Sequence, residues 1–230
     1  MKSSLGYGYG SEFQLLRFMG RHREELNEIL SKQLGISNNI YWLDFNYSQD
    51  NKSKDRELIG FQFLKSSVIN DLKVSEFWPD KGPNWDAVAV DGTTYLLIEA
   101  KAHIKELSHK NMTGAKNKSY DLIRRSIHSL QKKYKIPIDD LWLTDYYQLA
   151  NRLAFCDFLN EKGVSSRLVY ICFLNGYEYS YSGHKIINKS VKNKVEWQKA
   201  LNEMIEKMNI KGTPLEDLIE PVYIDCKPRY

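Results

Sequence analysis

The stretch Pro83–His103, PNWDAVAVDGTTYLLIEAKAH, carries the pattern that decides the fold. It predicts two β-strands joined by a tight turn, because Asp91-Gly92 is a strong signal for a two-residue hairpin loop. With that loop Asp86 is a diagonal neighbour of Glu99, and side-chain alternation puts both on one face together with Lys101. A loop two residues longer would oppose Asp86 directly to Glu99 and keep the shared face, whereas a one-residue slip would separate them.

The charges in this hairpin need partners. The run 96–98, Leu-Leu-Ile, is typical of a strand that is covered on both faces. Glu99 and Lys101 follow that run, and isolated charges are not left in such places. Two carboxylates whose β-carbons lie about 7 Å apart can close around one cation. We therefore expect Asp86 and Glu99 to hold a hard metal ion with Lys101 beside it; the alternative is an exposed hairpin in which Glu99 and Lys101 form a weak surface pair.

This pattern resembles the motif of the PD-(D/E)xK nuclease superfamily, because Asp86 is followed after twelve residues by Glu99-Ala100-Lys101. One departure is that Trp85, not proline, precedes Asp86, while Pro83 lies three residues upstream. The resemblance implies a restriction-endonuclease-like α-β-β-β-α-β core in a three-layer α/β/α sandwich with a central mixed sheet. It also implies Mg²⁺, with Mn²⁺ as an alternative, held by Asp86, Glu99 and the Ala100 carbonyl, and a catalytic Lys101.

The segment from Ser11 to Leu34 predicts one helix, with a capping box at its start and a stop at Gly35. Glu12 precedes apolar residues of this helix by three, four and seven positions, so we expect it to point along the inward stripe. The resemblance implies that Glu12 is an accessory catalytic carboxylate, because many members of the superfamily carry a glutamate on their first helix. The alternative is a first-turn acid favoured by the helix dipole.

The rest of the chain predicts one domain, residues 1–230, with a helical elaboration near 139–163. Further strands are expected at 39–47, 58–64, 167–174, 177–182 and 220–226, and helices at 67–72, 116–134, 141–162 and 196–208. The helix at 141–162 carries a polar and aromatic cluster that either binds bases, sugars or phosphates or packs in the core: Tyr146, Tyr147, Gln148, Asn151 and Arg152. The alternating tyrosines at 177–181 favour core packing or a subunit contact, and stacking on bases is the alternative. A homodimer is a further expectation.

The chain has a net charge of +4, but its charge is unevenly distributed. The segment from Ala102 to Lys135 contains nine Lys or Arg residues and only two acidic residues, Glu106 and Asp121. A segment of one sign beside a suspected metal site suits a polyanionic substrate. The alternative is a solvated basic helix and loop. We expect nucleic acid as the partner, DNA rather than RNA, and these contact residues: Lys105, Lys110, Lys116, Lys118, Arg124, Arg125 and Gln131.

Composition excludes several classes of protein. The longest apolar run, Leu168 to Leu174, has about seven residues, so no membrane span is expected. The N-terminal sequence lacks an apolar signal core, which favours a cytoplasmic location. Cys156, Cys172 and Cys226 are widely spaced in apolar settings and predict buried free thiols, not zinc ligands or disulfides.

The leading hypothesis is therefore a Mg²⁺-dependent nuclease. A non-catalytic nucleic-acid-binding or adaptor protein on the same fold is the alternative. A third hypothesis, an enzyme for a small phosphorylated substrate, lacks a phosphate-binding glycine loop, because the glycines at 6, 8 and 10 follow no strand. Neither a Ser/His/Asp triad nor an HExxH zinc motif is visible.

Overall fold

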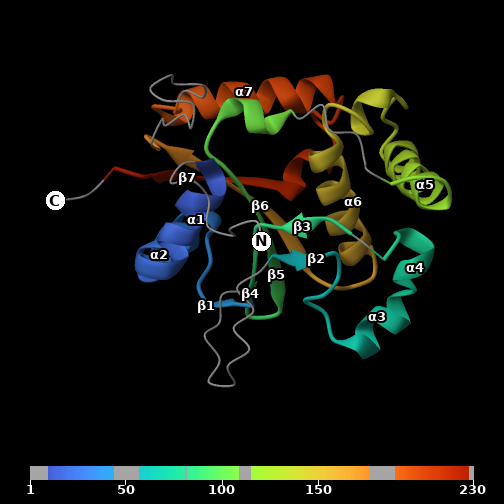
Figure 1. Ribbon diagram of the computed structural model, residues 1–230, viewed down its shortest axis with the longest axis horizontal. Helices are drawn as coiled ribbons and strands as arrows, with labels where there is room; N and C mark the ends of the chain where they lie inside the picture. The colour runs from blue at the N-terminus through green and yellow to red at the C-terminus, as the bar shows by residue number, and fades with distance from the viewer. Residues whose placement is uncertain (1–9, 44–56, 81, 109–114, 177–189, 228–230) are drawn as a thin grey trace.

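The computed structural model describes residues 10–43, 57–80, 82–108, 115–176 and 190–227 (Figure 1). These residues form a five-stranded mixed sheet in the order β1-β4-β5-β6-β7 and a two-stranded sheet of β2 and β3. The strands are β1 (Ile40–Trp42), β2 (Leu58–Ile59), β3 (Asn84–Trp85), β4 (Ala87–Asp91), β5 (Thr94–Lys101), β6 (Ser166–Leu174) and β7 (Ile219–Asp225).

Seven α-helices occur in the described residues, together with three short 3₁₀ helices. The α-helices are α1 (Gly10–Arg21), α2 (Arg23–Leu34), α3 (Ser66–Leu72), α4 (Val74–Phe77), α5 (Lys118–Lys133), α6 (Tyr147–Glu161) and α7 (Lys194–Lys207). The 3₁₀ helices are η1 (Ile104–Leu107), η2 (Asp140–Trp142) and η3 (Glu216–Leu218). None of these helices is long and apolar enough to cross a membrane.

The predicted hairpin is present as β4 and β5, but its turn lies one residue further along the chain. Ala87 pairs with Ile98 and Asp91 pairs with Thr94, so Gly92 and Thr93 form the loop. The prediction of a loop at Asp91-Gly92 was wrong, because Asp91 is still paired in the ladder and only Gly92 of these two residues has a positive φ, at 60°. This register equals the one expected for a loop two residues longer, and extending it by one pair beyond Ala87 would place Asp86 opposite Glu99.

The second half of the sheet is parallel. β5 pairs with β6, and β6 pairs with β7, each in parallel. Parallel neighbours need long crossovers, which α5 and α6 supply between β5 and β6 and α7 supplies between β6 and β7. β6 is buried on both faces over most of its length, as its uninterrupted apolar sequence predicts.

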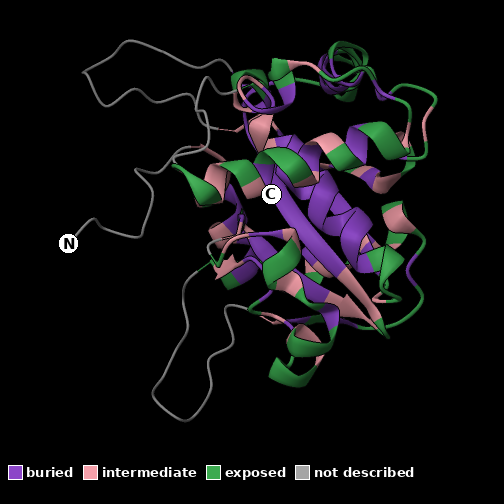
Figure 2. Ribbon diagram, turned by 90° about the vertical axis from the view of Figure 1, so that its right-hand side faces the viewer, coloured by how far each residue is buried: buried purple, intermediate pink, exposed green. Residues whose placement is uncertain are grey.

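Helices cover both faces of the large sheet, which gives a three-layer α/β arrangement (Figure 1). On one face, α1 and α2 bury Phe18, Met19 and Leu26 against the side of β5 that includes Ile98. On the other face, α6 packs on β6, and α5 packs beside α6. Buried residues follow the central strands, while the outer faces of the helices are exposed (Figure 2). The outermost strand, β7, also contacts α2, because the Gln33 side chain donates to the Tyr223 carbonyl and accepts from its N–H, at 2.9 and 3.0 Å.

Three predicted elements differ from the structure. The single helix at 11–34 is broken at His22, whose φ and ψ of −130° and 35° are not helical, although Gly35 ends α2 as expected. The helix predicted from 141 starts only at Tyr147, because Asp139 caps the short η2 helix first by accepting the Leu141 N–H. The strand predicted at 58–64 ends after two residues, at a turn beginning with Gly60. The strand predicted at 177–182 and residues 44–47 of that predicted at 39–47 lie outside the described residues.

The small β2–β3 sheet fixes the chain just before Asp86. Nε1 of Trp85 donates to the Gly60 carbonyl at 2.9 Å. Gly60 and Gly82 approach so closely that a Cβ on Gly82 would lie 2.5 Å from the Gly60 Cα and 2.9 Å from the Phe155 ring. This contact joins the small sheet to α6, and therefore holds the entry to β4 against the helix that completes the site described below.

Candidate active site

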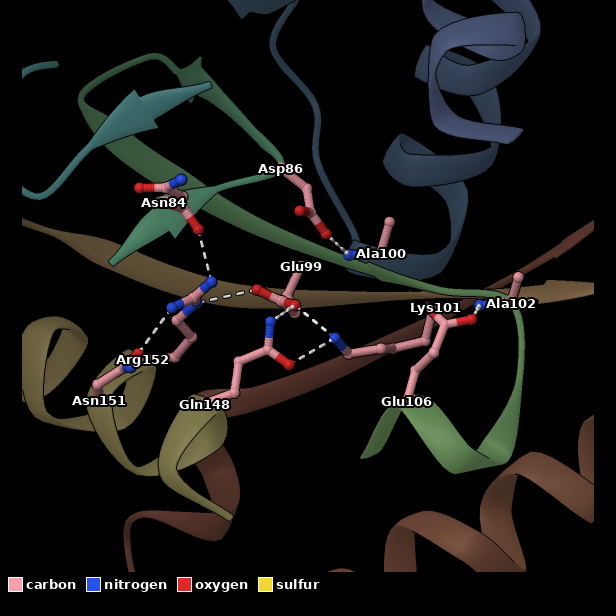
Figure 3. Close-up of polar contacts among 10 residues, drawn as sticks. All are labelled: Asn84, Asp86, Glu99, Ala100, Lys101, Ala102, Glu106, Gln148, Asn151 and Arg152. Carbon is pink, nitrogen blue, oxygen red and sulfur yellow. Dashed lines mark hydrogen bonds and ion pairs between the residues drawn. The ribbon is translucent and has the colours of Figure 1, made fainter. Parts of the chain in front are cut away.

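Asp86 lies between β3 and β4, where the chain turns into the hairpin. Its Oδ2 accepts the N–H of Ala100 at 2.7 Å, as Figure 3 shows. That bond ties the start of β4 to the end of β5. Ala100, which the sequence predicts as a carbonyl ligand, is thus placed beside Asp86 through its N–H, and the role of its carbonyl stays a prediction.

Glu99 is completely buried near the end of β5, and its two oxygens accept three donors (Figure 3). Nζ of Lys101 lies 2.5 Å from Oε1, and Nε2 of Gln148 donates to the same oxygen at 2.6 Å. Nε of Arg152 donates to Oε2 at 2.9 Å. Burying a charged carboxylate is costly unless it is paired in this way, so the two cations account for the presence of Glu99 in the core.

Gln148 links the acid to the lysine. Its Nε2 donates to Glu99 while its Oε1 accepts from Nζ of Lys101 at 2.9 Å. Gln148 and Arg152 are four residues apart on α6, so they lie on the same side of the helix and reach β5 together. The sequence grouped these two residues in a polar cluster but gave no sign that Glu99 is their partner.

The two carboxyl groups have opposite electrostatic settings. Burial raises the pKa of Asp86 to about 8, with a further increase from the charge on Glu99, which Lys101, the Ala100 N–H and Arg152 only partly offset. The Asp86 side chain nevertheless keeps some solvent exposure. Burial acts on Glu99 in the same sense, but Arg152 and Lys101 outweigh it and hold the pKa of Glu99 below its ordinary value.

The predicted catalytic residues divide into two groups. Asp86, Glu99 and Lys101 come together at the end of β5, where they interact electrostatically. Glu12 does not join them through any hydrogen bond or ion pair of the described residues, and it is exposed on α1. The interpretation that it points along the inward stripe was wrong, because the buried positions of α1 start at Gln14. Partial burial and the charge on Glu57 raise the pKa of Glu12.

The predicted nucleic-acid contacts also divide. Five of them are exposed: Lys105, Lys116, Lys118, Arg124 and Arg125. Lys110 lies outside the described residues. Gln131 was wrongly predicted as a surface contact, because it is completely buried and its Nε2 donates to the Pro137 carbonyl at 3.1 Å. The helical period explains the error, since Gln131 follows the buried Ile127 by one helical turn.

A recess of about 460 Å³ lies elsewhere, between α4, α5 and α6. Its walls include the stacked rings of Phe77 and Phe158, with centroids 4.1 Å apart, and the ion pair of Lys133 with Asp157. None of Asp86, Glu99 and Lys101 lines it. Its lining mixes both charge signs with apolar groups and indicates no particular ligand, so the candidate site rests on the polar network of β5 and α6.

Whether this network fits a hard cation depends on oxygens that remain available. Within the described residues, Oδ1 of Asp86 makes no hydrogen bond and Oε2 of Glu99 accepts a single donor. Mg²⁺ is often bound by one or two carboxylates and completes its shell with water and substrate phosphates. Asp86 and Glu99 fit that minimal set. No group of three or more His, Cys, Asp or Glu residues able to hold a metal ion occurs in the part of the chain that the structure describes.

Comparison with known proteins found no matching family model, no matching curated protein and no matching solved structure. The functional argument therefore rests on the residues themselves.

Proposed function

We propose that this protein is a metal-dependent nuclease of the PD-(D/E)xK type, which hydrolyses phosphodiester bonds in nucleic acid, DNA in preference to RNA. The observation that carries the proposal is the grouping of Asp86, Glu99 and Lys101 at the end of one hairpin, within electrostatic reach of one another. The order of elements along the chain supports it. A helical segment, the strands β1, β4 and β5, the helix α6 and the strand β6 follow the α-β-β-β-α-β order of that superfamily, with additions between them.

In this proposal Asp86 and Glu99 hold Mg²⁺, with Mn²⁺ as a substitute. The bound ion would supply an acidified water and neutralise charge on the phosphate. Lys101 is fixed by Glu99 and Gln148, so its ammonium is positioned without reorganisation to stabilise the negative charge that develops during hydrolysis. The surrounding core excludes water and thereby strengthens that interaction.

The test compares cleavage of double-stranded DNA, single-stranded DNA and RNA by the wild type and by two variants, with Mg²⁺, Mn²⁺ or EDTA. Asp86→Asn removes a metal-binding charge, and Lys101→Met removes the ammonium but keeps most of the apolar stem. Each should lower the cleavage rate by roughly 10³-fold or more, since metal activation and charge stabilisation each contribute several kcal/mol.

Arg167→Met is a matched control, because Arg167 pairs with Glu220 at the β6–β7 end of the sheet. It should leave cleavage near the wild-type rate. Thermal melts establish that each variant is folded. Cleavage that survives both Asp86→Asn and Lys101→Met would show that the active site lies elsewhere.

A non-catalytic nucleic-acid-binding or adaptor protein is the second candidate. One observation favours it: both oxygens of Glu99 are already bound by groups of the protein itself, as in a purely structural ion-pair network. This candidate predicts that the wild type binds nucleic acid but leaves every substrate of the panel uncut with either metal.

A further inference from the structure

The guanidinium of Arg152 is surrounded by oxygen atoms. Nε donates to Oε2 of Glu99 at 2.9 Å, one terminal nitrogen donates to Oδ1 of Asn151 at 2.7 Å, and the other to the Asn84 carbonyl at 2.5 Å. The Trp85 ring lies on one side, with its centroid 5.2 Å from the guanidinium carbon. Figure 3 shows these oxygens directed at the guanidinium from β5, from β3 and from α6.

A carboxylate, an amide oxygen and a backbone carbonyl are also the donor types that hard divalent cations select. The arrangement around Arg152 therefore has the composition of a cation site, with a guanidinium at its centre. Arg152 is only 4% exposed, and the three bonds to separate groups keep it from withdrawing into solvent. A guanidinium also remains charged at every physiological pH.

Glu99 has little capacity for further partners. A carboxylate offers about four lone-pair directions, and Lys101, Gln148 and Arg152 already take three of them. The direction that remains is on Oε2, the oxygen that Arg152 holds. Glu99 can thus serve one metal ion beside Asp86, but it cannot bridge two.

Charge leads to the same conclusion. With Asp86 ionised, the two carboxylates balance Lys101 and Arg152. One divalent ion would leave a surplus of two positive charges, which the phosphates of a bound strand can neutralise. A second ion would double that surplus beside Glu99, where solvent screening is weak because the residue is completely buried.

We propose that Arg152 is a positioning residue that stands where a second metal ion would bind, so that the site takes a single divalent cation. The inference rests on the proposed function, because it assumes that Asp86 and Glu99 hold a metal ion. It deepens that function by fixing how many ions the site holds and which side chain sets the number.

The experiment titrates the full-length protein with Mn²⁺ in the absence of nucleic acid, by calorimetry and by the electron paramagnetic resonance signal of free Mn²⁺. The wild type should bind one ion per chain, and Asp86→Asn should abolish that binding. Arg152→Met should bind two, because it frees the oxygens of Glu99, Asn84 and Asn151. Arg152→Lys, which keeps the charge, and the matched control Arg167→Met should each bind one.

Two Mn²⁺ ions bound by the wild type and reduced by Asp86→Asn would overturn the role of Arg152 while leaving the nuclease proposal intact. A folded Arg152→Met that still binds one ion would do the same. If Arg152→Met does not fold, Mn²⁺ anomalous scattering from a soaked wild-type crystal decides: one peak beside Asp86 supports the inference, and two peaks overturn it. A wild type that neither binds Mn²⁺ nor cuts nucleic acid would overturn the proposed function, and the inference with it.

Discussion

Asp86 and Glu99 are similar carboxylic acids that each lie six residues from the same hairpin loop, yet their surroundings act on them in opposite ways. Glu99 is bound by two cations and an amide, and its pKa is lowered. Asp86 has only the Ala100 N–H as a hydrogen-bond donor within the described residues, and its pKa is raised. Without a bound cation the folded protein therefore favours a protonated Asp86, and the energetic cost of the site falls mainly on this one residue.

This cost predicts a pH-dependent stability in EDTA. The folded-state pKa of Asp86, about 8, exceeds the ordinary value of 3.8. Between these values the folded state retains a proton that the unfolded state has released, so the contribution of Asp86 to stability falls as pH rises from about 4 to 8. Asp86→Asn should remove that fall and stabilise the protein at pH 8 by on the order of 2 kcal/mol, reduced from the full shift because Asp86 is partly exposed.

Urea unfolding of the wild type and of Asp86→Asn at pH 5 and pH 8 measures this difference. Asp91→Asn is the control, because Asp91 lies in the same hairpin but bonds to the exposed Asn38 side chain at 2.8 Å. A difference in stability between wild type and Asp86→Asn that is the same at both pH values would contradict the raised pKa.

At the scale of elements, α5 is the part of the basic segment that the structure describes most fully. It buries Ile123, Ile127 and Leu130 and leaves Arg124 and Arg125 exposed. This division follows from the 3.6-residue period of the helix. α5 packs beside α6, so the exposed basic face belongs to the layer that also carries Gln148 and Arg152.

Double substitution of Arg124 and Arg125 by Gln should weaken binding to a nonspecific DNA duplex and make it less dependent on salt. Each phosphate contact contributes roughly 0.9 to the slope of log affinity against log salt concentration, so the slope should fall by about 2. Fluorescence anisotropy at several salt concentrations measures it. The same charge removal at the exposed Lys199 and Lys207 of α7 is the matched control; an equal effect from both pairs would mean that only net charge matters.

The sequence was sufficient to predict which neighbouring residues of one element share a face, but it was insufficient to predict contacts between residues far apart in the chain. Alternation along β5 predicted that Glu99 and Lys101 share a face, and their contact confirms it. The meeting of Glu99 with Arg152 could not be predicted, because 53 residues separate them and helix periodicity does not identify the strand that a helix covers. Gln131 was wrongly predicted as exposed for a related reason. A polar residue in a basic helix is expected at the surface, and the sequence does not show that the Pro137 carbonyl accepts its hydrogen bond inside the protein.

At the scale of the whole molecule, the contact of Gly60 with Gly82 connects the small sheet, α6 and the start of β4. A methyl group at Gly82 would collide with backbone and with the Phe155 ring. Gly82→Ala should therefore destabilise the protein by roughly 1–3 kcal/mol, and it should also lower any cleavage activity, since Asp86 follows four residues later.

Gly20→Ala is the matched control for Gly82→Ala, because a Cβ at this position in α1 meets nothing within 4 Å. It should be neutral or stabilising by up to about 1 kcal/mol, as expected for replacing glycine in a helix. Urea unfolding curves measure both variants. Equal stability of the two alanine variants would show that the Gly60–Gly82 contact relaxes without cost.

The two hydrogen bonds between Gln33 and Tyr223 of β7 affect how copies of this protein associate at high concentration. An outer strand offers unpaired N–H and carbonyl groups that another chain can join, which is a common route to aggregation. At Tyr223 a side-chain amide already occupies both groups, as a neighbouring strand would. Growth of the sheet from one molecule into the next is thus obstructed at this point of β7. In the large sheet formed by the described residues, the opposite outer strand is β1, whose exposed Tyr41 makes it the edge more open to such association.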